Sequence, residues 1–384
     1  MLTQYEIWLG AVLHDIGKFA QRAHGGTEPD DFPDSMRGLV LPHNQTGLYT
    51  HTHALWTYYT IEKHLAPVLM ANRDIDWDVV RDLASFHHNP RNPAEEIIRD
   101  ADCISAKIDR IQDDETHYKR GDHLKVALRP IIASVRLRDG ESALESDTLT
   151  TGWRTLPAAL TADNMRPTQY DDSRPLTNAY RQAWDGFLQE IKSIPSEILT
   201  HRDRLTACLG GIILKYTWSI PSATNDKLHD IPLYDHLTST AAIALARFAA
   251  GEISTGTKPY RMFAATPTGI QNFIFRNPTG GFKGNTKVIR ARSLTIAAMT
   301  DILRYALSDA SGILPYTQIV QAGGRLVAIL PNTPDMIGRI QAFALKLEDD
   351  SFTRWHGAFG YACSFDVEAD DNDLAPGNFG FLMD

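Results

Sequence analysis

Residues 11–23 read AVLHDIGKFAQRA and set a histidine next to an aspartate inside an apolar run. Val12 and Ile16 lie four residues apart, which predicts a buried helix that carries His14 and Asp15. An adjacent imidazole and carboxylate can share or bridge divalent metal ions when neighbouring helices supply the remaining ligands. The stretch therefore predicts a helical domain organised around a metal site.

The remaining ligands are expected from three later segments, each within or beside an apolar helix. Between His51 and His53 we favour His53, because it opens an amphipathic helix. Asp102 could instead cap its helix or pair with Arg99 or Lys107. The predicted metal ligands are His14, Asp15, His53, His87, His88 and Asp102.

This ligand set indicates metal-assisted hydrolysis. Carboxylates and imidazoles without cysteine favour Mn, Fe, Ni, Co or Mg over a structural zinc ion. One or two such ions would lower the pKa of a bound water and hold a phosphodiester oxygen. His14 and Asp15 are thus the predicted catalytic pair. Lys18, one helical turn after His14, is expected to contact the phosphate or to screen the carboxylate.

Composition places the chain among globular proteins. With 384 residues, 43% of them hydrophobic, we expect about two or three domains. The net charge of −9 gives no general attraction to nucleic acid. Three widely spaced cysteines argue against a disulfide framework or a zinc finger, and they favour a cytoplasmic location. No apolar run is long enough to span a membrane, so no membrane partner is expected.

Residues 1–250 are predicted to be mainly helical. Residues 24–50 are rich in Gly, Pro, Asp and Asn and are expected to form a long loop. Residues 111–175 are weakly patterned and are interpreted as an irregular insertion. Helical periodicity returns at about 176–193, 201–218 and 236–250.

The pattern changes near residue 252, where GEISTGTKPY indicates a linker. A strand, a Pro-Thr-Gly turn, a long helix, a hairpin, a second helix and a last strand follow in residues 258–384. This order is that of a ferredoxin-like βαββαβ unit. The fold class is therefore α+β, with a ferredoxin-like domain at 258–384 that ends in the start of a linker. One face of the long helix is expected to hold Leu294, Ala298, Ile302 and Tyr305.

Several motifs together resemble the large subunit of type III CRISPR effector complexes. LHDIGKFAQRA is followed by YTHTHALWT, by FHHNP and by the AD of RDADCISAKIDR. KYTWSIPSATND and IPLYDHLTSTAAIALA come later, and TPTGIQNFIF, IRARSL and QAGGRLVAILPNT look like the first palm domain of that family. The similarity covers about 1–135 and 200–384 and points to the III-A, Csm-type branch.

The resemblance implies an HD nuclease domain that cuts single-stranded DNA, internally or from an end, with Mn, Ni or Co, and Mg as a further candidate. It implies that the six predicted ligands belong to the HD motif and that Asp235 and His236, in the family's YDH, support the site. It also implies an antiviral complex with a small subunit and a subunit that caps the guide 5′ end. CRISPR RNA, target RNA and single-stranded DNA are the implied nucleic-acid partners.

The family's second palm domain, whose GGDD turn makes cyclic oligoadenylates, is missing from this sequence. The hairpin turn here is Ala322-Gly323-Gly324-Arg325, so a cation stands where a carboxylate would hold metals. Thr266 likewise replaces an aspartate of the family pattern. We therefore expect no cyclic oligoadenylate synthesis by this chain alone. We expect a truncated chain, a split gene with the second palm on a separate chain, or a compact variant.

Basic residues between positions 276 and 304 form a candidate nucleic-acid contact. Glycines lead into a helix there, and Asp301 is the only acidic residue of the stretch. A loop that leads into a helix N-terminus suits phosphate contact, whereas a solvated helix face would explain the same charges equally well. The candidate residues are Lys283, Lys287, Arg290 and Arg292.

Two other functions stay open. A stand-alone HD phosphohydrolase acting on nucleotides would explain the ligands but not the motifs of the second half. A non-catalytic scaffold subunit with a vestigial site is disfavoured by the intact His14–Asp15 pair.

Overall fold

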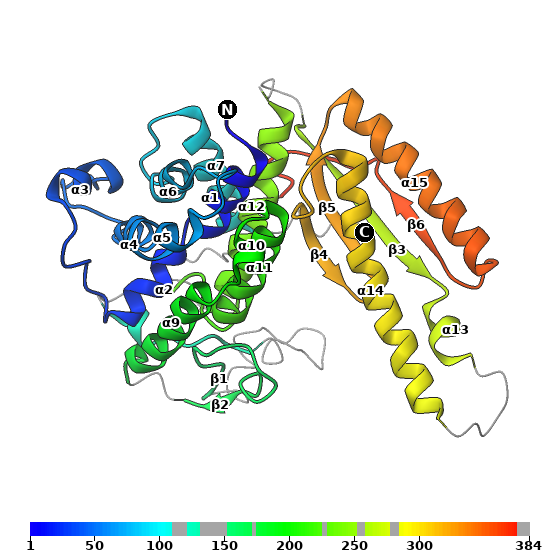
Figure 1. The fold of residues 1–384 in the computed structure, drawn as a ribbon, viewed down its shortest axis with the longest axis horizontal. Helices are drawn as coiled ribbons and strands as arrows, with labels where there is room; N and C mark the ends of the chain where they lie inside the picture. Colours follow the sequence, from blue (N-terminus) through cyan, green and yellow to red (C-terminus); the bar gives the residue numbers. More distant parts are fainter. Residues whose placement is uncertain are drawn as a thin grey trace. The chain divides into compact units, whose positions relative to one another are not determined.

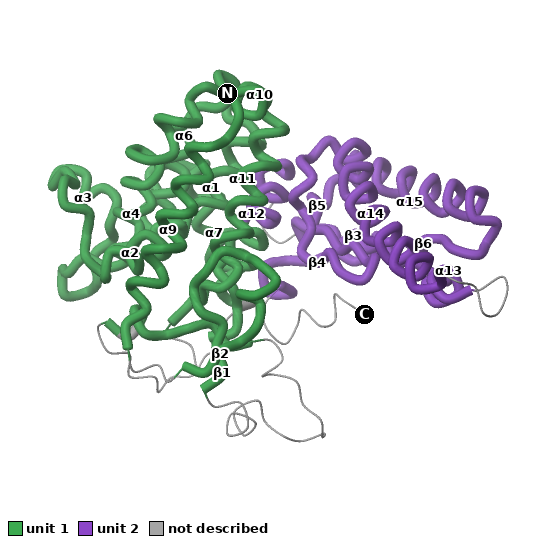
Figure 2. The backbone as a smooth tube through the Cα atoms, turned by 60° about the horizontal axis from the view of Figure 1, so that its bottom comes forward, with its two compact units in different colours: residues 1–240 green, residues 241–384 purple. Residues whose placement is uncertain are grey.

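The computed structural model describes residues 1–109, 121–130, 152–170, 174–224, 229–251, 258–276 and 284–374. The chain forms two compact units, Met1–Thr240 and Ala241–Asp384 (Figure 2). The expected mixture of helices and sheet is confirmed. Every helix in the described ranges is too short or too polar to cross a bilayer.

Helices build most of the described part of unit 1 (Figure 1). The helices expected at 176–193 and 201–218 are confirmed as α9 and α11. Helix α12 begins in unit 1 and continues into unit 2. The elements are α1 (Gln4–Leu13), α2 (Ile16–Ala23), α3 (Asp34–Val40), α4 (His53–Thr60), η1 (Ile61–Leu65), α5 (Ala66–Leu69), α6 (Trp77–Ser85), α7 (Pro93–Asp109), η2 (Asp122–Leu124), β1 (Trp153–Arg154), β2 (Thr168–Gln169), α9 (Thr177–Lys192), α10 (Ser196–Leu199), α11 (Arg202–Thr217) and α12 (Leu233–Ala250).

The single helix expected around His14 and Asp15 is in fact two helices. Helix α1 ends just before His14, and α2 begins just after Asp15. Thr57 of α4 holds this break, because its hydroxyl donates to the His14 carbonyl at 2.8 Å and accepts from the Gly17 amide at 3.1 Å. The apolar spacing continues across the break, so periodicity alone did not reveal it.

Glycine allows α2 to approach α4 closely. A Cβ atom at Gly17 would lie 2.0 Å from the carbonyl oxygen of His53 and 2.6 Å from the amide nitrogen of Thr57. Backbone atoms cannot swing aside, so this position requires a residue without a Cβ. A second close contact joins α1 to α6, where a Cβ at Gly10 would lie 2.6 Å from the Cβ of Leu83. These two contacts fix the helices that carry or flank the predicted ligands.

The segment expected to be a long loop at 24–50 contains helix α3. Phe32, Val40 and Leu41 are buried and belong to the same hydrophobic cluster as Leu55 of α4. Burial of these side chains stabilises a short helix despite the glycine- and proline-rich composition around it. The prediction of an entirely irregular segment was therefore wrong.

Unit 2 contains a five-stranded antiparallel sheet with the strand order β4-β5-β3-β6, and β7 pairs with the start of β3. Helices α14 and α15 pack against each other, and α15 also packs against β6 (Figure 1). The expected order of strand, helix, hairpin, helix and strand is observed, whereas β7 was not expected. The elements are β3 (Tyr260–Thr268), α13 (Ile270–Phe275), α14 (Asn285–Ser311), β4 (Gln318–Ala322), β5 (Arg325–Pro331), α15 (Pro334–Trp355), β6 (Gly360–Ser364) and β7 (Glu368–Ala369).

Glycines make the two sharp reversals of unit 2. Gly323 and Gly324 join β4 to β5 with φ values of 60° and 88°, which confirms the predicted hairpin. Pro267 and Thr268, expected in a turn, instead pair with β6 as the end of β3. The chain turns only at Gly269, whose φ of 74° places it in the left-handed region before α13.

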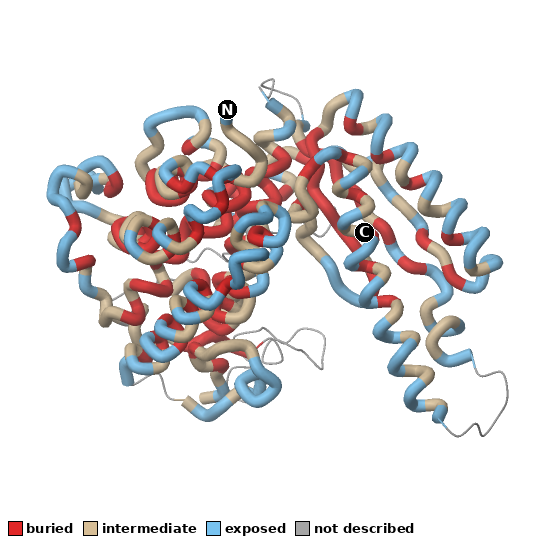
Figure 3. The backbone as a smooth tube through the Cα atoms, viewed as in Figure 1, coloured by how far each residue is buried: buried red, intermediate tan, exposed pale blue. Residues whose placement is uncertain are grey.

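The residues expected to share one face of α14 lie on the helix as expected, and this face is exposed (Figure 3). Leu294 retains 70% and Ile302 retains 66% of its accessible surface. Helix α14 carries two apolar stripes, and periodicity does not tell which one meets the sheet. The exposed stripe is Leu294, Ala298, Ile302 and Tyr305, and the buried one includes Ile296, Thr300, Leu303 and Leu307.

Candidate metal centre

Histidine and aspartate side chains from five places in unit 1 converge on one centre. They come from the junction of α1 and α2, the start of α4, the turn after α6, and helices α7 and α12. They form two groups of four whose possible ligand atoms all lie within 4.8 Å of one another, and Asp15 belongs to both. The first group is Asp15, His53, His87 and His88, and the second is His14, Asp15, Asp102 and His236.

In the first group, ring nitrogens face a carboxylate and one another. His53 Nε2 lies 3.0 Å from Asp15 Oδ1 and 3.0 Å from His88 Nε2. The rings of His87 and His88 are 3.9 Å apart. The structure thus brings His53 into the centre, as the sequence favoured, while His51 belongs to neither group.

In the second group, two imidazoles face two carboxylates. His14 Nε2 lies 3.4 Å from both Asp15 Oδ2 and Asp102 Oδ1. His236 Nε2 lies 3.1 Å from Asp102 Oδ1. Arg99, a partner that the sequence left open for Asp102, pairs with Asp100 instead.

The backbone orients the buried histidines. The Nδ1 atoms of His14 and His87 each lie 2.7 Å from a carbonyl oxygen, that of Ala11 and that of Ala84 respectively. A carbonyl only accepts, so Nδ1 carries the proton and Nε2 keeps its lone pair for the centre. Both Nε2 atoms are buried and lack a hydrogen-bond partner. A bound cation would satisfy these orphaned atoms, so the residues present fit a metal ion.

The electrostatics keep most of the ligands in their metal-binding protonation states. Burial and the neighbouring His14 lower the pKa of His87 to about 3. Burial acts to raise the pKa of Asp15, but Lys18, His14 and His53 outweigh it and hold that pKa well below its usual range. His87 is therefore neutral and Asp15 ionised near neutral pH, as metal ligation requires.

His14 behaves differently. Burial acts to lower its pKa, but the nearby carboxylates of Asp15 and Asp102 outweigh burial and raise it. Without a metal, a proton on His14 therefore balances part of the negative charge of the centre.

Lys18 contacts the centre from its rim. Its Nζ lies 2.5 Å from Asp15 Oδ2 and donates to the Ser222 carbonyl at 3.1 Å. This geometry fits the expected screening of the carboxylate, while contact with a phosphate stays a prediction.

His236 was expected only to support the site, yet its ring lies inside the second group. Its Nδ1 lies 3.0 Å from the Ser105 hydroxyl, which leaves Nε2 directed at Asp102. The sequence feature that could have indicated a place inside the centre is that His236 shares an apolar, buried stripe of α12 with Leu233 and Leu237. Asp235 is exposed and belongs to neither group, so its supporting role stays a prediction.

The basic candidates belong to unit 2, whereas the candidate metal centre belongs to unit 1. Lys287 and Arg290 are exposed on α14, whereas Lys283 lies outside the described residues. Arg292 donates to the carbonyl oxygens of Ile274 and Arg276 at 3.3 and 2.7 Å, which ties α14 to the end of α13. Their contact with nucleic acid stays a prediction.

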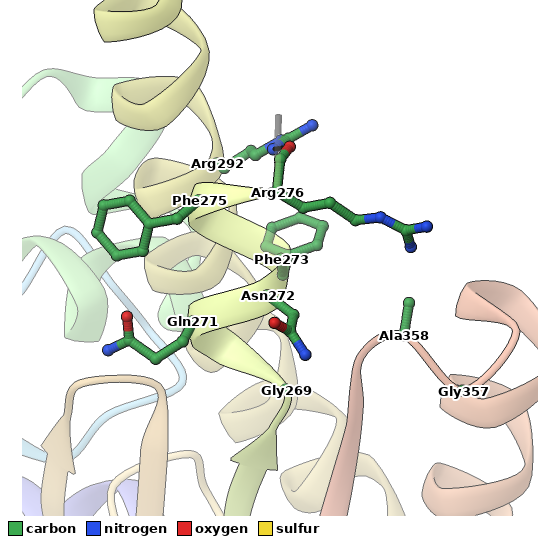
Figure 4. Close-up of a pocket in the computed structure, with 9 residues that line it drawn as sticks. All are labelled: Gly269, Gln271, Asn272, Phe273, Phe275, Arg276, Arg292, Gly357 and Ala358. Carbon is green, nitrogen blue, oxygen red and sulfur yellow. Dashed lines mark hydrogen bonds between the residues drawn. The ribbon is translucent and has the colours of Figure 1, made fainter. Parts of the chain in front are cut away.

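An open pocket of about 670 Å³ lies beside α13 (Figure 4). Arg276, Arg292 and the backbone around Gly357 and Ala358 contribute to its lining. Phe275 is 58% exposed at this pocket. The pocket holds two guanidinium groups but none of the ligand-type side chains of the metal centre.

The chain is therefore a two-unit protein, in which a helical unit carries a histidine–aspartate centre and the second unit has the order βαββαβ. Within the second unit, residues 259–379 match the family described as Csm1 subunit domain B.

Two curated relatives are each described as "CRISPR system single-strand-specific deoxyribonuclease Cas10/Csm1 (subtype III-A)". The one from Thermococcus onnurineus is 32% identical over 144 residues, which cover 35% of this chain and 18% of the relative. The one from Methanocaldococcus jannaschii is 24% identical over 357 residues, which cover 82% and 40%. The chain is thus a relative of the Cas10/Csm1 large subunit of subtype III-A, as its motifs predicted, and it spans less than half the length of these relatives.

Solved structures share the fold at low sequence identity. The crystal structure of Csm1 from T. onnurineus has a TM-score of 0.62 at 20% identity and covers 95% of this chain and 45% of that one. A Csm1–Csm4 cassette in complex with pppApApA has a TM-score of 0.63 at 19% identity and covers 97% and 47%.

Proposed function

We propose that this chain is a metal-dependent phosphodiesterase that cuts single-stranded DNA as part of a type III-A CRISPR complex. The observation that carries the proposal is the pair of ligand groups that share Asp15. We assign residues 1–250 to an HD nuclease domain, with the irregular insertion at about 111–175. Residues 258–384 are assigned to the first, ferredoxin-like palm domain.

The residues of the chain divide the work at the centre. One or two ions, of Mn, Ni or Co, or else Mg, would supply an activated water and a positive charge at the scissile phosphate. Asp15 would hold both ligand groups together, and the backbone carbonyls of Ala11 and Ala84 keep His14 and His87 aimed inward. Lys18 keeps Asp15 ionised and adds a cation on the side from which an anionic substrate would approach.

The proposal places cyclic oligoadenylate synthesis outside this chain. Arg325 begins β5 directly after the glycine turn, and Thr266 lies on the neighbouring strand β3. A cation and a hydroxyl at these places do not supply the carboxylates that a two-metal nucleotide site needs.

The partners follow from the relatives. A related solved structure is a Csm1–Csm4 subcomplex of the type III-A CRISPR-Csm interference complex, and we propose that a Csm4-type subunit caps the guide beside this chain. A small subunit, CRISPR RNA, target RNA and, in a split arrangement, a chain with the second palm complete the proposed cytoplasmic assembly.

The proposal is tested by cleavage of a labelled single strand with Mn²⁺ added to the metal-free chain. We expect cleavage by the wild type, none by the His14→Ala, Asp15→Ala double variant, and unchanged cleavage by His356→Asn. His356 is an exposed histidine of unit 2 with a φ of 49°, which asparagine tolerates, so it controls for histidine loss alone. Equal cleavage by the double variant would overturn the proposal.

The two alternatives give different results in the same assay. Hydrolysis of free deoxynucleotides without cutting of oligonucleotides would identify a nucleotide phosphohydrolase. Absence of Mn²⁺ and Ni²⁺ binding in calorimetry would identify a scaffold.

A further inference from the structure

A short hairpin directly precedes His53, a member of the first group of the candidate centre, in the chain. His43 and Tyr49 form an isolated antiparallel bridge, and the Thr50 amide donates to the Pro42 carbonyl at 3.0 Å. The side-chain oxygen of Asn44 accepts from the amides of Thr46 and Leu48, at 3.0 and 2.9 Å, and so braces the tip. We call residues 42–51 the site hairpin.

The site hairpin presents a pair of rings to solvent. Tyr49 is 41% exposed, and its ring centroid lies 4.4 Å from that of the exposed His43 at an angle of 37°. The Tyr49 hydroxyl rests over Gly38 of α3, where an added Cβ would lie 3.3 Å away. The Tyr49 ring is therefore held by His43 and Gly38 while part of it stays open to solvent.

The hairpin leads into the metal centre. His51 follows Tyr49 by two residues, and its ring centroid lies 4.0 Å from that of His88, a member of the first ligand group. His51 also has a φ of 57°, a strained conformation for a residue with a side chain, and such strain concentrates at functional sites. The backbone from Tyr49 to His51 can span roughly 7 Å, which is about the length that two neighbouring nucleotides, each rising about 3.4 Å, cover along a strand.

The charge of the hairpin suits an anionic strand. The chain has a net charge of −9, yet residues 41–53 contain no aspartate or glutamate. A phosphate backbone passing over the hairpin would therefore meet no carboxylate of the hairpin itself.

We propose that the site hairpin is a nucleobase-stacking subsite that delivers a single strand to the metal centre. The proposal rests on the proposed function and adds the source of strand specificity to it. A base splayed out of a single strand stacks on the Tyr49–His43 pair, while its neighbour passes His51 to reach the ligands. Bases inside a duplex are stacked on one another and cannot reach these rings.

The test compares two strands and two variants. The strands are a short oligothymidine and the same backbone with abasic sites, each supplied with Mn²⁺ to the full chain. Tyr49→Ala is expected to raise the KM for oligothymidine about tenfold, equal to about 1.4 kcal/mol, with kcat little changed. Tyr49→Phe keeps the ring and should behave like the wild type. The abasic strand should be cut by the wild type and by Tyr49→Ala with the same low efficiency.

The outcomes separate this proposal from the proposed function. An unchanged KM for oligothymidine in Tyr49→Ala overturns the subsite, as does an equal loss on both strands, which would indicate a backbone contact or a folding defect. If the wild type cuts neither strand, the proposed function fails, and the same comparison is made by fluorescence anisotropy of binding. In that case the subsite is supported if the wild type binds oligothymidine more tightly than the abasic strand and Tyr49→Ala loses this preference. Equal binding of the two strands by the wild type overturns it.

Discussion

The metal centre of unit 1 and the glycine turn of unit 2 are two places where a nucleotide-processing protein could hold metal ions. The centre gathers its candidate ligands from five separate places, and Asp15 belongs to both groups. The turn is local: Gly323 and Gly324 shape it, but Arg325 follows them. A correct backbone turn without carboxylates lacks the ligands that a two-metal nucleotide site needs, so the comparison shows that side chains, not the turn, decide where such chemistry can occur.

The largest effect is expected at the ligand that both groups share. Asp15→Asn keeps the size of the side chain but removes its charge. Residues that only hold a metal ligand in place cost about 10- to 100-fold when mutated, so loss of a shared ligand should lower the rate of single-strand cleavage by more than about 100-fold. Initial rates with saturating Mn²⁺ measure this loss. A drop below tenfold would show that Asp15 does not bridge the groups.

The Ser105 hydroxyl tests support of the centre from outside. It contacts His236 Nδ1 at 3.0 Å, so Ser105→Ala should weaken Mn²⁺ binding or activity by about 10- to 100-fold. Ser193→Ala removes an exposed hydroxyl at the end of α9 and serves as the matched control. Equal Mn²⁺ affinity in calorimetry and equal activity of the two variants would show that the Ser105 hydroxyl does not support the centre.

The pH dependence of metal binding should follow His14. Its pKa is raised above the usual 6.5, so at pH 6 a metal ion must displace its proton, whereas His87, with a pKa of about 3, is already neutral. Mn²⁺ affinity should therefore fall by up to about tenfold per pH unit below the His14 pKa. Calorimetry at pH 6 in buffers of different ionisation enthalpy measures the released proton, and His14→Ala should release none.

The raised pKa of His14 also affects the stability of the metal-free fold, with the opposite dependence on pH. Because the folded-state pKa of His14 is raised, its contribution to stability is fully present below pH 6.5 and is lost as pH rises through the folded-state value. The lowered pKa values of Asp15 and Asp102 stabilise the fold above about pH 4 and lose that effect on acidification.

The glycine contact between α2 and α4 should matter for stability. Gly17→Ala sets a Cβ 2.0 Å from the His53 carbonyl oxygen, and such overpacking lowers the free energy of unfolding by about 1–3 kcal/mol. Gly211→Ala in α11 meets no atom within 4 Å and should stabilise the chain slightly. Thermal unfolding of the two variants should therefore shift in opposite directions.

The smallest effect is expected at the turn of unit 2. Arg325→Asp restores one carboxylate after the glycines, yet one carboxylate on this strand does not make a two-metal site. ATP incubated with this variant and Mg²⁺ should yield no oligoadenylate by chromatography. Product formation would show that the turn is a latent catalytic site and that Arg325 alone silences it.

Sequence reasoning predicted those residues of the candidate centre that carry a local motif. His14, Asp15 and the pair His87–His88 stand out because adjacent polar residues interrupt apolar helices. His236 was underestimated, because its role depends on the approach of α12 to α7, which no local pattern records. The break between α1 and α2 escaped for a related reason: Thr57, far along the chain, holds it.

The same limit explains the errors in unit 2. The order of strands and helices followed from alternation and turn residues, which are local. Which stripe of α14 is buried is a fact of tertiary packing, so the periodicity that placed Leu294 on one face did not show that the stripe of Ile296 is the buried one.

Because one carboxylate belongs to two ligand sets, the affinities of the two sets for cations are linked thermodynamically. Any factor by which occupation of the His53 side changes affinity on the His236 side must act equally in the other direction, since the coupling free energy is reciprocal. If each group takes one of the proposed ions, titration should yield two macroscopic binding constants that describe the whole centre, and neither constant belongs to a single set of residues.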